Sequence, residues 1–163
     1  MIAGPADHTF CYYAGYVDDT SSHASQLAKS VCFFSPLQFL FWYDRPSQMS
    51  KDQEFEFFKH LPTTWDESRV LHSKIGNYAA IARRNGKNWF VGCLNAVEPR
   101  TLDVSFDFLP KGKTFTAHIY QDDDSVNTRT KVGIEKRDVT ATSVFRAELA
   151  KQGGVAIRLV PKN

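Results

Sequence analysis

Apolar residues near the start of the chain recur at the spacing of a helix. From Ser22 onward they fall three, four and seven positions apart, which places them on one stripe of an α-helix. Thr20, Ser21 or Ser22 can cap its first turn with a side-chain oxygen. Pro36 ends the helix, since proline forces the preceding residue out of helical geometry. The predicted stripe consists of Ala24, Leu27, Ala28, Val31 and Phe34.

The next segment, Leu37–Tyr43, is apolar on both faces. This pattern is typical of a strand in a parallel sheet that helices cover on both sides. A turn at residues 44–46 and a second helix from about Ser50 to Leu61 follow, and Pro62 ends that helix. Alternating strands and helices indicate βα units. Either this half packs on the rest of the chain in an unusual way, or the rest of its sheet lies on missing chain, which we favour.

After Pro62 the period of the pattern changes from 3.6 to 2. Two alternating segments, residues 78–84 and 87–94, flank Asn85-Gly86, a pair that favours a hairpin with a type I′ turn. Leu102, Val104 and Phe106 then alternate with polar residues, so one face of that strand is dry and the other is wet. The segment from Phe115 to Tyr120 repeats this pattern. Further strands are expected at about 68–71, 131–139, 143–149 and 155–160.

These patterns predict an α+β protein. Residues 1–62 form a βαβα piece, and residues 63–163 form an antiparallel β-sandwich, because about seven or eight short strands follow one another without a helix. We place the boundary between the two domains at Pro62.

Composition and charge exclude several classes of protein. The chain has 163 residues, of which 42% are hydrophobic, so it is not a disordered segment. Its formal charge of +2 and the lack of a basic run give no case for nucleic acid or an anionic membrane. The longest apolar-rich run, Pro36–Tyr43, is far shorter than the ~20 residues of a membrane span. The N-terminus does not read as a signal peptide.

Cysteine and histidine spacing predicts no metal site. Cys11, Cys32 and Cys93 match no zinc pattern, and we expect buried free thiols. The histidines stand singly along the chain.

Several motifs resemble glycoside hydrolase family 97, the bacterial α-glucosidases and α-galactosidases. Leu61–Leu71 (LPTTWDESRVL), followed by Lys74–Tyr78, is similar to the junction between barrel and C-terminal sandwich in that family. Ala82–Gly92 resembles the hairpin that follows this junction. Upstream, Ala3–Thr9, residues 22–28 and residues 35–38 resemble the family's loop, helix and strand in the same order. His8 replaces an expected tyrosine, and Ser25 replaces a frequent histidine.

The resemblance implies that this chain is the C-terminal portion of a larger hydrolase. It would contain the last two βα units of a (β/α)₈ barrel and the C-terminal sandwich, without catalytic residues of its own. In that family the catalytic glutamates, the calcium-binding carboxylates of inverting members and the aspartate nucleophile of retaining members lie upstream. The implied partners are the remainder of the barrel and α-linked glucose or galactose saccharides. The family is typically periplasmic or secreted, but the chain itself does not indicate a location.

In a barrel, functional residues lie in loops after the carboxyl ends of strands. This rule makes Asp7, His8, Tyr43 and Asp44 candidates for the rim of a sugar pocket. The alternative is ordinary turn chemistry, with aspartate closing an Asx-turn and histidine exposed to solvent.

Other acidic and aromatic residues have simpler explanations. Asp66 and Glu67 point to opposite faces of a strand, which suits hydrogen bonding at the junction better than catalysis. Residues 122–124 (DDD) lack the glycine and distal glutamate of a calcium loop, so we expect a solvated hairpin tip. Trp65 and Trp89 are expected to pack in the interior. If they instead stack on sugar, the chain is an autonomous carbohydrate-binding or protein-interaction module, the alternative function.

Overall fold

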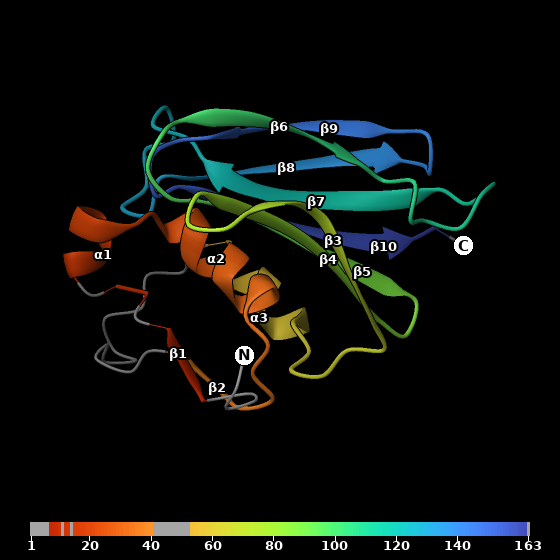
Figure 1. Ribbon diagram of the computed structural model, residues 1–163, viewed down its shortest axis with the longest axis horizontal. Coiled ribbons are helices and arrows are strands. Elements are labelled where there is room, and N and C mark those ends of the chain that lie inside the picture. Colours follow the sequence, from red (N-terminus) through yellow and green to blue (C-terminus); the bar gives the residue numbers. More distant parts are fainter. Residues whose placement is uncertain (1–6, 11, 14, 41–52, 163) are drawn as a thin grey trace.

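A computed structural model of the chain describes residues 7–10, 12, 13, 15–40 and 53–162. It contains two β-sheets stacked on each other, with helices against the outer face of the larger sheet (Figure 1). The helices are α1 (Gly15–Thr20), α2 (His23–Cys32) and α3 (Phe55–His60). The strands are β1 (His8–Phe10), β2 (Gln38–Leu40), β3 (Glu67–Lys74), β4 (Tyr78–Asn85), β5 (Asn88–Asn95), β6 (Arg100–Ser105), β7 (Phe115–Asp122), β8 (Val132–Val139), β9 (Val144–Leu149) and β10 (Gly154–Pro161).

The second half of the chain is the predicted antiparallel sandwich. Six strands form one sheet in the order β3-β4-β5-β10-β7-β8, and β6 and β9 form the second sheet. Every pairing within these two sheets is antiparallel. Between the sheets lies the larger hydrophobic core, whose biggest buried members include Trp89, Phe106, Ile119, Phe145 and Ile157.

The hairpin between β4 and β5 forms where the sequence predicts it, but the turn lies one residue later. Asn85 pairs with Asn88 as the last pair of the ladder, so Gly86 and Lys87 occupy the turn. Gly86 has a φ of +58°, whereas neither Asn85 nor Lys87 has a positive φ. The predicted type I′ turn on Asn85-Gly86 is therefore wrong, because that type requires positive φ at both central residues.

A second hydrophobic cluster joins the helices to the outer face of the six-stranded sheet. Leu27 and Val31 of α2 and Phe57 of α3 belong to it, together with Phe90 and Tyr120 of the sheet. A Cβ added to Gly92 would lie 2.6 Å from the carbonyl oxygen of Ala28, so α2 packs very close to β5. Tyr120 is thus buried, although the alternation along β7 predicted a wet face, because helices cover this side of the sheet.

The predicted helix after Ser22 is confirmed, including its cap. Ser22 precedes α2 and its side-chain oxygen accepts a hydrogen bond from the amide of Ser25. The second predicted helix is present as α3, which begins later than expected, and residues 50–52 of the prediction lie outside the described residues. The sequence did not predict α1.

Strands β1 and β2 form a separate two-stranded parallel sheet, in which His8 pairs with Gln38 and Phe10 with Leu40. Leu37 and Phe39 are 48% and 40% exposed, so the burial on both faces that the sequence pattern predicts is not reached in this structure. As a whole, the described chain is mostly antiparallel β-sheet with few helices. Within the described residues, none of the helices has the length and apolar character needed to cross a membrane.

Candidate functional site

The structure describes two of the four predicted rim residues, Asp7 and His8. Asp7 is exposed and directly precedes β1, and His8 is the first residue of β1. The prediction that His8 lies in a loop after a strand is therefore wrong, because His8 is part of β1 and pairs with Gln38 of β2. Tyr43 and Asp44 lie outside the described residues.

His8 lies in an aromatic, partly buried environment. Its ring meets the rings of Phe10 and Phe33 edge-on, with centroids 4.3 and 5.1 Å away. Burial, and secondarily the positive charge of Lys29, lower the pKa of His8 below its ordinary value. The buried Nε2 atom of His8 has no hydrogen-bond partner among the described residues. This environment favours the neutral form of the His8 imidazole and encloses its Nε2.

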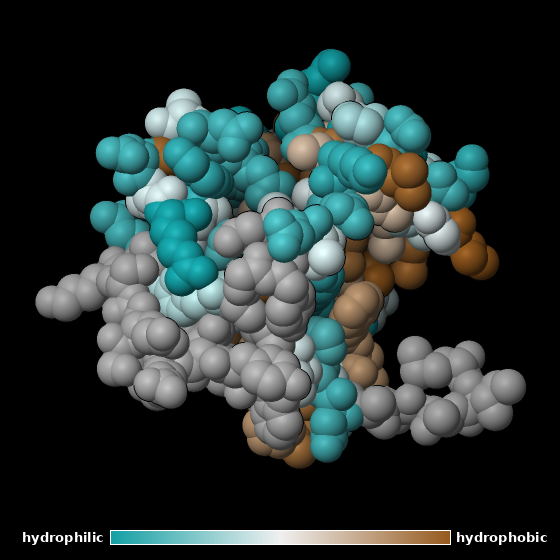
Figure 2. Space-filling view, turned by 90° about the vertical axis from the view of Figure 1, so that its left-hand side faces the viewer, coloured by the Kyte–Doolittle hydropathy of each residue, from teal (hydrophilic) through white to brown (hydrophobic). Residues whose placement is uncertain are grey.

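Hydrophobic side chains gather on the surface beside His8. Phe33 and Phe34 directly follow α2, Leu37 directly precedes β2, and Phe39 lies within β2. All four side chains are exposed. Figure 2 shows hydrophobic surface at the bottom of the molecule, the side on which Figure 1 places β1 and β2. Exposed apolar groups that lie together commonly mark a surface that another part of a protein covers.

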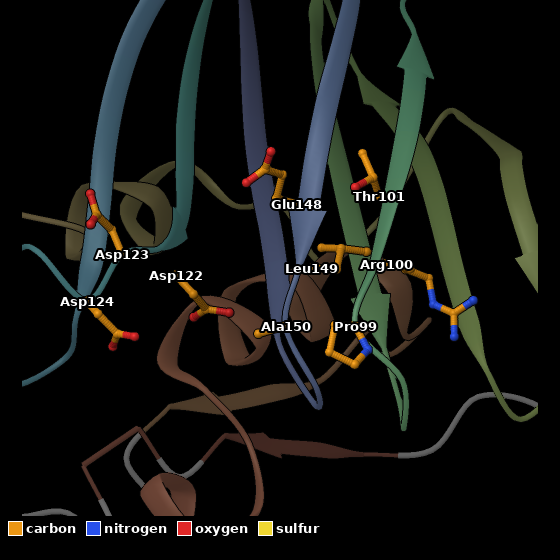
Figure 3. Close-up of a pocket in the computed structure, with 9 residues that line it drawn as sticks. All are labelled: Pro99, Arg100, Thr101, Asp122, Asp123, Asp124, Glu148, Leu149 and Ala150. Carbon is orange, nitrogen blue, oxygen red and sulfur yellow. The ribbon is translucent and has the colours of Figure 1, made fainter.

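Figure 3 shows an acidic pocket at one end of the sandwich, with a volume of about 480 Å³. Its lining comes from the ends of β7 and β9 and the start of β6. The guanidinium of Arg100 points away from the acidic side chains (Figure 3), and its Nε donates to Oδ1 of Asn95 at 2.6 Å. Among the residues that the structure describes, no group of three or more His, Cys, Asp and Glu side chains could hold a metal ion.

Residues 122–124 are predicted to form a solvated hairpin tip, but Asp122 is partly buried beside α2. Its carboxylate accepts a hydrogen bond from the amide of Gly154 at 3.1 Å, and the Ser22 hydroxyl and the Ala24 amide at the start of α2 act on its pKa in the lowering direction. It thus ties the first turn of α2 to the sheet, and burial is the main cause that raises its pKa. Asp123 and Asp124 lie nearer solvent, and Asp123 accepts from the amide and hydroxyl of Ser125, as in a local turn.

Asp66 and Glu67 hydrogen-bond at the junction, as predicted. Oδ2 of Asp66 accepts from the amide of Gly86 at 2.8 Å and from Arg84 at 3.2 Å. Glu67 accepts from Nε of Arg84 and Nε of Arg69. These side chains hold the tip of the β4–β5 hairpin against the start of β3.

Trp89 packs in the interior, as predicted, and Trp65 is partly buried against the second hydrophobic cluster. Trp89 is only 3% exposed, with the ring of Phe108 4.7 Å away on one side and the guanidinium carbon of Arg69 5.7 Å from its centroid. Trp65 contacts the ring of Phe90 edge-on. Cys32 and Cys93 are buried free thiols, also as predicted.

Comparison with known proteins identifies the family. Residues 64–160 match the family model described as Glycosyl-hydrolase 97 C-terminal, oligomerisation. This match covers more than half of the chain and coincides with β3 through β10. The chain belongs to glycoside hydrolase family 97. The earlier resemblance of its motifs to this family is thereby confirmed.

Similar proteins extend the match beyond the sandwich. A retaining alpha-galactosidase from Bacteroides thetaiotaomicron is 31% identical over 98% of this chain. A family 97 enzyme from Pseudoalteromonas sp. strain K8, solved in complex with acarbose, is 34% identical over 88% of this chain, with a TM-score of 0.79. The crystal structure of a beta-arabinopyranosidase is 26% identical over 85% of the chain, with a TM-score of 0.70.

This chain spans only part of these family 97 proteins. It covers 26% of the alpha-galactosidase and 23% of the acarbose-bound enzyme. It thus matches the C-terminal portion of family 97, about a quarter of the length of these relatives.

Proposed function

We propose that this chain serves an α-glycoside hydrolase whose catalytic carboxylates lie in other parts of the enzyme. In this proposal residues 1–62 are the last two βα units of a (β/α)₈ barrel, and residues 63–163 are the C-terminal sandwich domain. The sandwich supports the barrel, and α2 and α3 connect the two through the hydrophobic cluster they share with Phe90 and Tyr120.

The parallel pair of β1 and β2 carries this proposal. A two-stranded parallel sheet is not stable alone, because parallel strands are normally buried between helices within a larger sheet. Leu37 and Phe39 remain exposed beside this pair, as they would if neighbouring barrel strands and helices normally cover them. Burying such side chains stabilises a protein by about 1.5–3 kcal/mol each, so an uncovered barrel fragment lacks a large part of its stabilisation.

The relatives support α-linked glucose or galactose as the sugar class. One curated relative is named a retaining alpha-galactosidase, and family 97 structures from Pseudoalteromonas contain acarbose or panose. Hydrolysis of a glycosidic bond needs two carboxyl groups about 5–10 Å apart, one protonated and one ionised. In our proposal the rest of the barrel supplies both of them.

Asp7, His8, Tyr43 and Asp44 are the proposed rim residues of this chain. Asp7 offers an exposed carboxylate to a sugar, and His8 beside it carries a buried Nε2 without a partner among the described residues. The described residues do not fit a calcium site, so a calcium ion in an inverting enzyme would take its ligands elsewhere, and we derive no step through it.

Hydrolysis of nitrophenyl glycosides tests the proposed function. The purified 163-residue chain is expected to release no nitrophenol from the α-galactoside or the α-glucoside. The full hydrolase that contains it is expected to cleave one or both, with inactivation when a barrel carboxylate is replaced. Nitrophenol release by the chain alone would overturn the proposal.

A further inference from the structure

The loop between β7 and β8 of the sandwich, residues 123–131, is braced by its own hydrogen bonds. At its base, the amide of Asp123 donates to the carbonyl oxygen of Lys131 at 2.8 Å. Across the loop, Nζ of Lys131 donates to the carbonyl oxygen of Val126 at 3.0 Å. Oδ1 of Asp123 also accepts from the amide and the hydroxyl of Ser125. The loop is thus a stiff extension of the sheet, from which a side chain can act at a fixed position.

Arg129 reaches from this loop to the segment that follows β1. Its Nη2 atom donates a hydrogen bond to the carbonyl oxygen of Tyr13, and its guanidinium carbon lies 5.1 Å from the centroid of the Tyr13 ring. Tyr13 itself is only 5% exposed. Figure 1 shows α1, which follows Tyr13 along the chain, at the end of the sandwich where β7 and β8 are connected. A charged hydrogen bond and a cation–π contact therefore tie this segment to the sandwich.

Tyr12, the neighbour of Tyr13, connects the same segment to the start of α3. Its hydroxyl donates to Oε1 of the buried Glu54 at 3.1 Å, and Glu54 directly precedes α3. The rings of Tyr12 and Tyr13 lie 5.2 and 5.7 Å from the ring of Phe55, the first residue of α3. The contact made by Arg129 therefore reaches two connections, the one after β1 and the one that leads from β2 into α3.

Both connections begin at the same edge of the β1–β2 pair. The two strands are parallel, so the chain leaves them, after Phe10 and after Leu40, on the same side. In (β/α)₈ barrels the active site lies at the face that carries the carboxyl ends of the strands. Of the proposed rim residues, Tyr43 and Asp44 follow β2 in the sequence. Under the proposed function, the two connections held by Arg129 belong to the face that binds the sugar.

We propose that Arg129 is a positioning residue for glycoside hydrolysis. From the sandwich it fixes the loop after β1 and, through Tyr12 and Glu54, the entry to α3. Its guanidinium is engaged by Tyr13, so it acts on the sugar only through the placement of these loops. Such placement matters, because a displacement of about 1 Å can cost about 10²-fold in rate. This inference rests on the proposed function, since the reaction that Arg129 serves is that of the full hydrolase.

Steady-state kinetics of the full hydrolase test the positioning role. Arg129→Met removes the hydrogen bond and the charge, and we expect it to lower kcat/KM for the nitrophenyl α-glycoside that the enzyme cleaves about tenfold, through a higher KM. Arg129→Lys keeps a donor and a charge, so its kcat/KM should lie between those of the wild type and Arg129→Met. Arg146→Met is the matched control, because Arg146 is exposed on β9 of the other sheet, and its kcat/KM should not change.

Three kinetic results would overturn the inference. The first is an unchanged kcat/KM in Arg129→Met, and the second is an equal decrease in Arg146→Met. The third is a lower kcat with unchanged KM and a lower midpoint of thermal unfolding, because that combination reports a loss of folded enzyme and not a displacement of loops.

Hydrogen exchange in the full hydrolase tests the contact itself without using the activity. In Arg129→Met, the amides of Tyr12, Tyr13 and α1 should exchange about tenfold faster than in the wild type, whereas amides of β5 should be unchanged. Equal exchange in the two proteins would overturn the inference. Faster exchange in a hydrolase that cleaves no α-glycoside would contradict the proposed function and leave the contact of Arg129 confirmed, so the two failures are distinguishable. Arg129→Lys carries both tests if Arg129→Met does not fold.

Discussion

Asp122 lies between the start of α2 and the sheet: it accepts a hydrogen bond from the Gly154 amide, and Ser22 and Ala24 of α2's first turn act on its pKa. The sequence shows three consecutive aspartates and predicts one solvated turn, since nothing in the pattern distinguishes the first from the others. Only the packing of α2 on β7 and β10 selects Asp122 as the buried one.

Replacing Asp122 by alanine is expected to destabilise the chain. Loss of the helix cap and of a buried acceptor should lower the free energy of unfolding by about 1–2 kcal/mol, measured by urea denaturation. Asp124→Ala is the matched control, and its expected change is within about 0.5 kcal/mol because Asp124 is exposed. Equal effects of the two substitutions would contradict the capping role.

The buried carboxyl of Asp122 also predicts a pH dependence. Burial raises its pKa above the ordinary 3.8, so between that pH and the folded-state pKa the folded chain holds a proton that the unfolded chain has lost. The contribution of Asp122 to stability is therefore largest below about pH 3.8 and declines as pH rises through the folded-state pKa. The stability of the wild type relative to Asp122→Asn should fall over this range. Parallel curves for the two proteins would contradict a raised pKa.

At the scale of elements, period-2 patterns predict the strands of the sandwich, and a capped apolar stripe predicts α2. The patterns do not show which second layer covers each strand. Tyr120 is therefore assigned to a wet face by its alternation, yet it lies under Phe57 of α3.

Gly92→Ala tests the contact between α2 and β5. The added methyl group would lie 2.6 Å from the Ala28 carbonyl oxygen and 2.8 Å from Sγ of Cys32, so α2 must move. We expect a loss of about 1–3 kcal/mol and faster labelling of the Cys32 thiol, whose pKa burial now raises. Gly112→Ala is the control: it strains a residue with φ of +74° but meets no neighbour, so it should leave Cys32 protected. Unchanged labelling in Gly92→Ala would contradict the close packing.

At the scale of the whole molecule, a closed antiparallel sandwich carries helices and an open pair of parallel strands on one side (Figure 1). The period-2 patterns predict the antiparallel sheets, and the domain boundary at Pro62 stays a prediction. The rim candidates are less well predicted, since a rule about loops after barrel strands assigns His8 to a loop and the structure places it in β1. Under the proposed function, their role depends on barrel strands in the rest of the enzyme.

Hydrogen exchange compared between the isolated chain and the full hydrolase tests the central claim most directly. If β1 and β2 belong to a barrel, the amides of residues 8–10 and 38–40 should exchange quickly in the isolated chain and become protected by orders of magnitude in the full enzyme. Amides of β5 and β10, in the centre of the sandwich, should be protected in both proteins. Equal exchange of β1 and β2 in the two proteins would contradict the account.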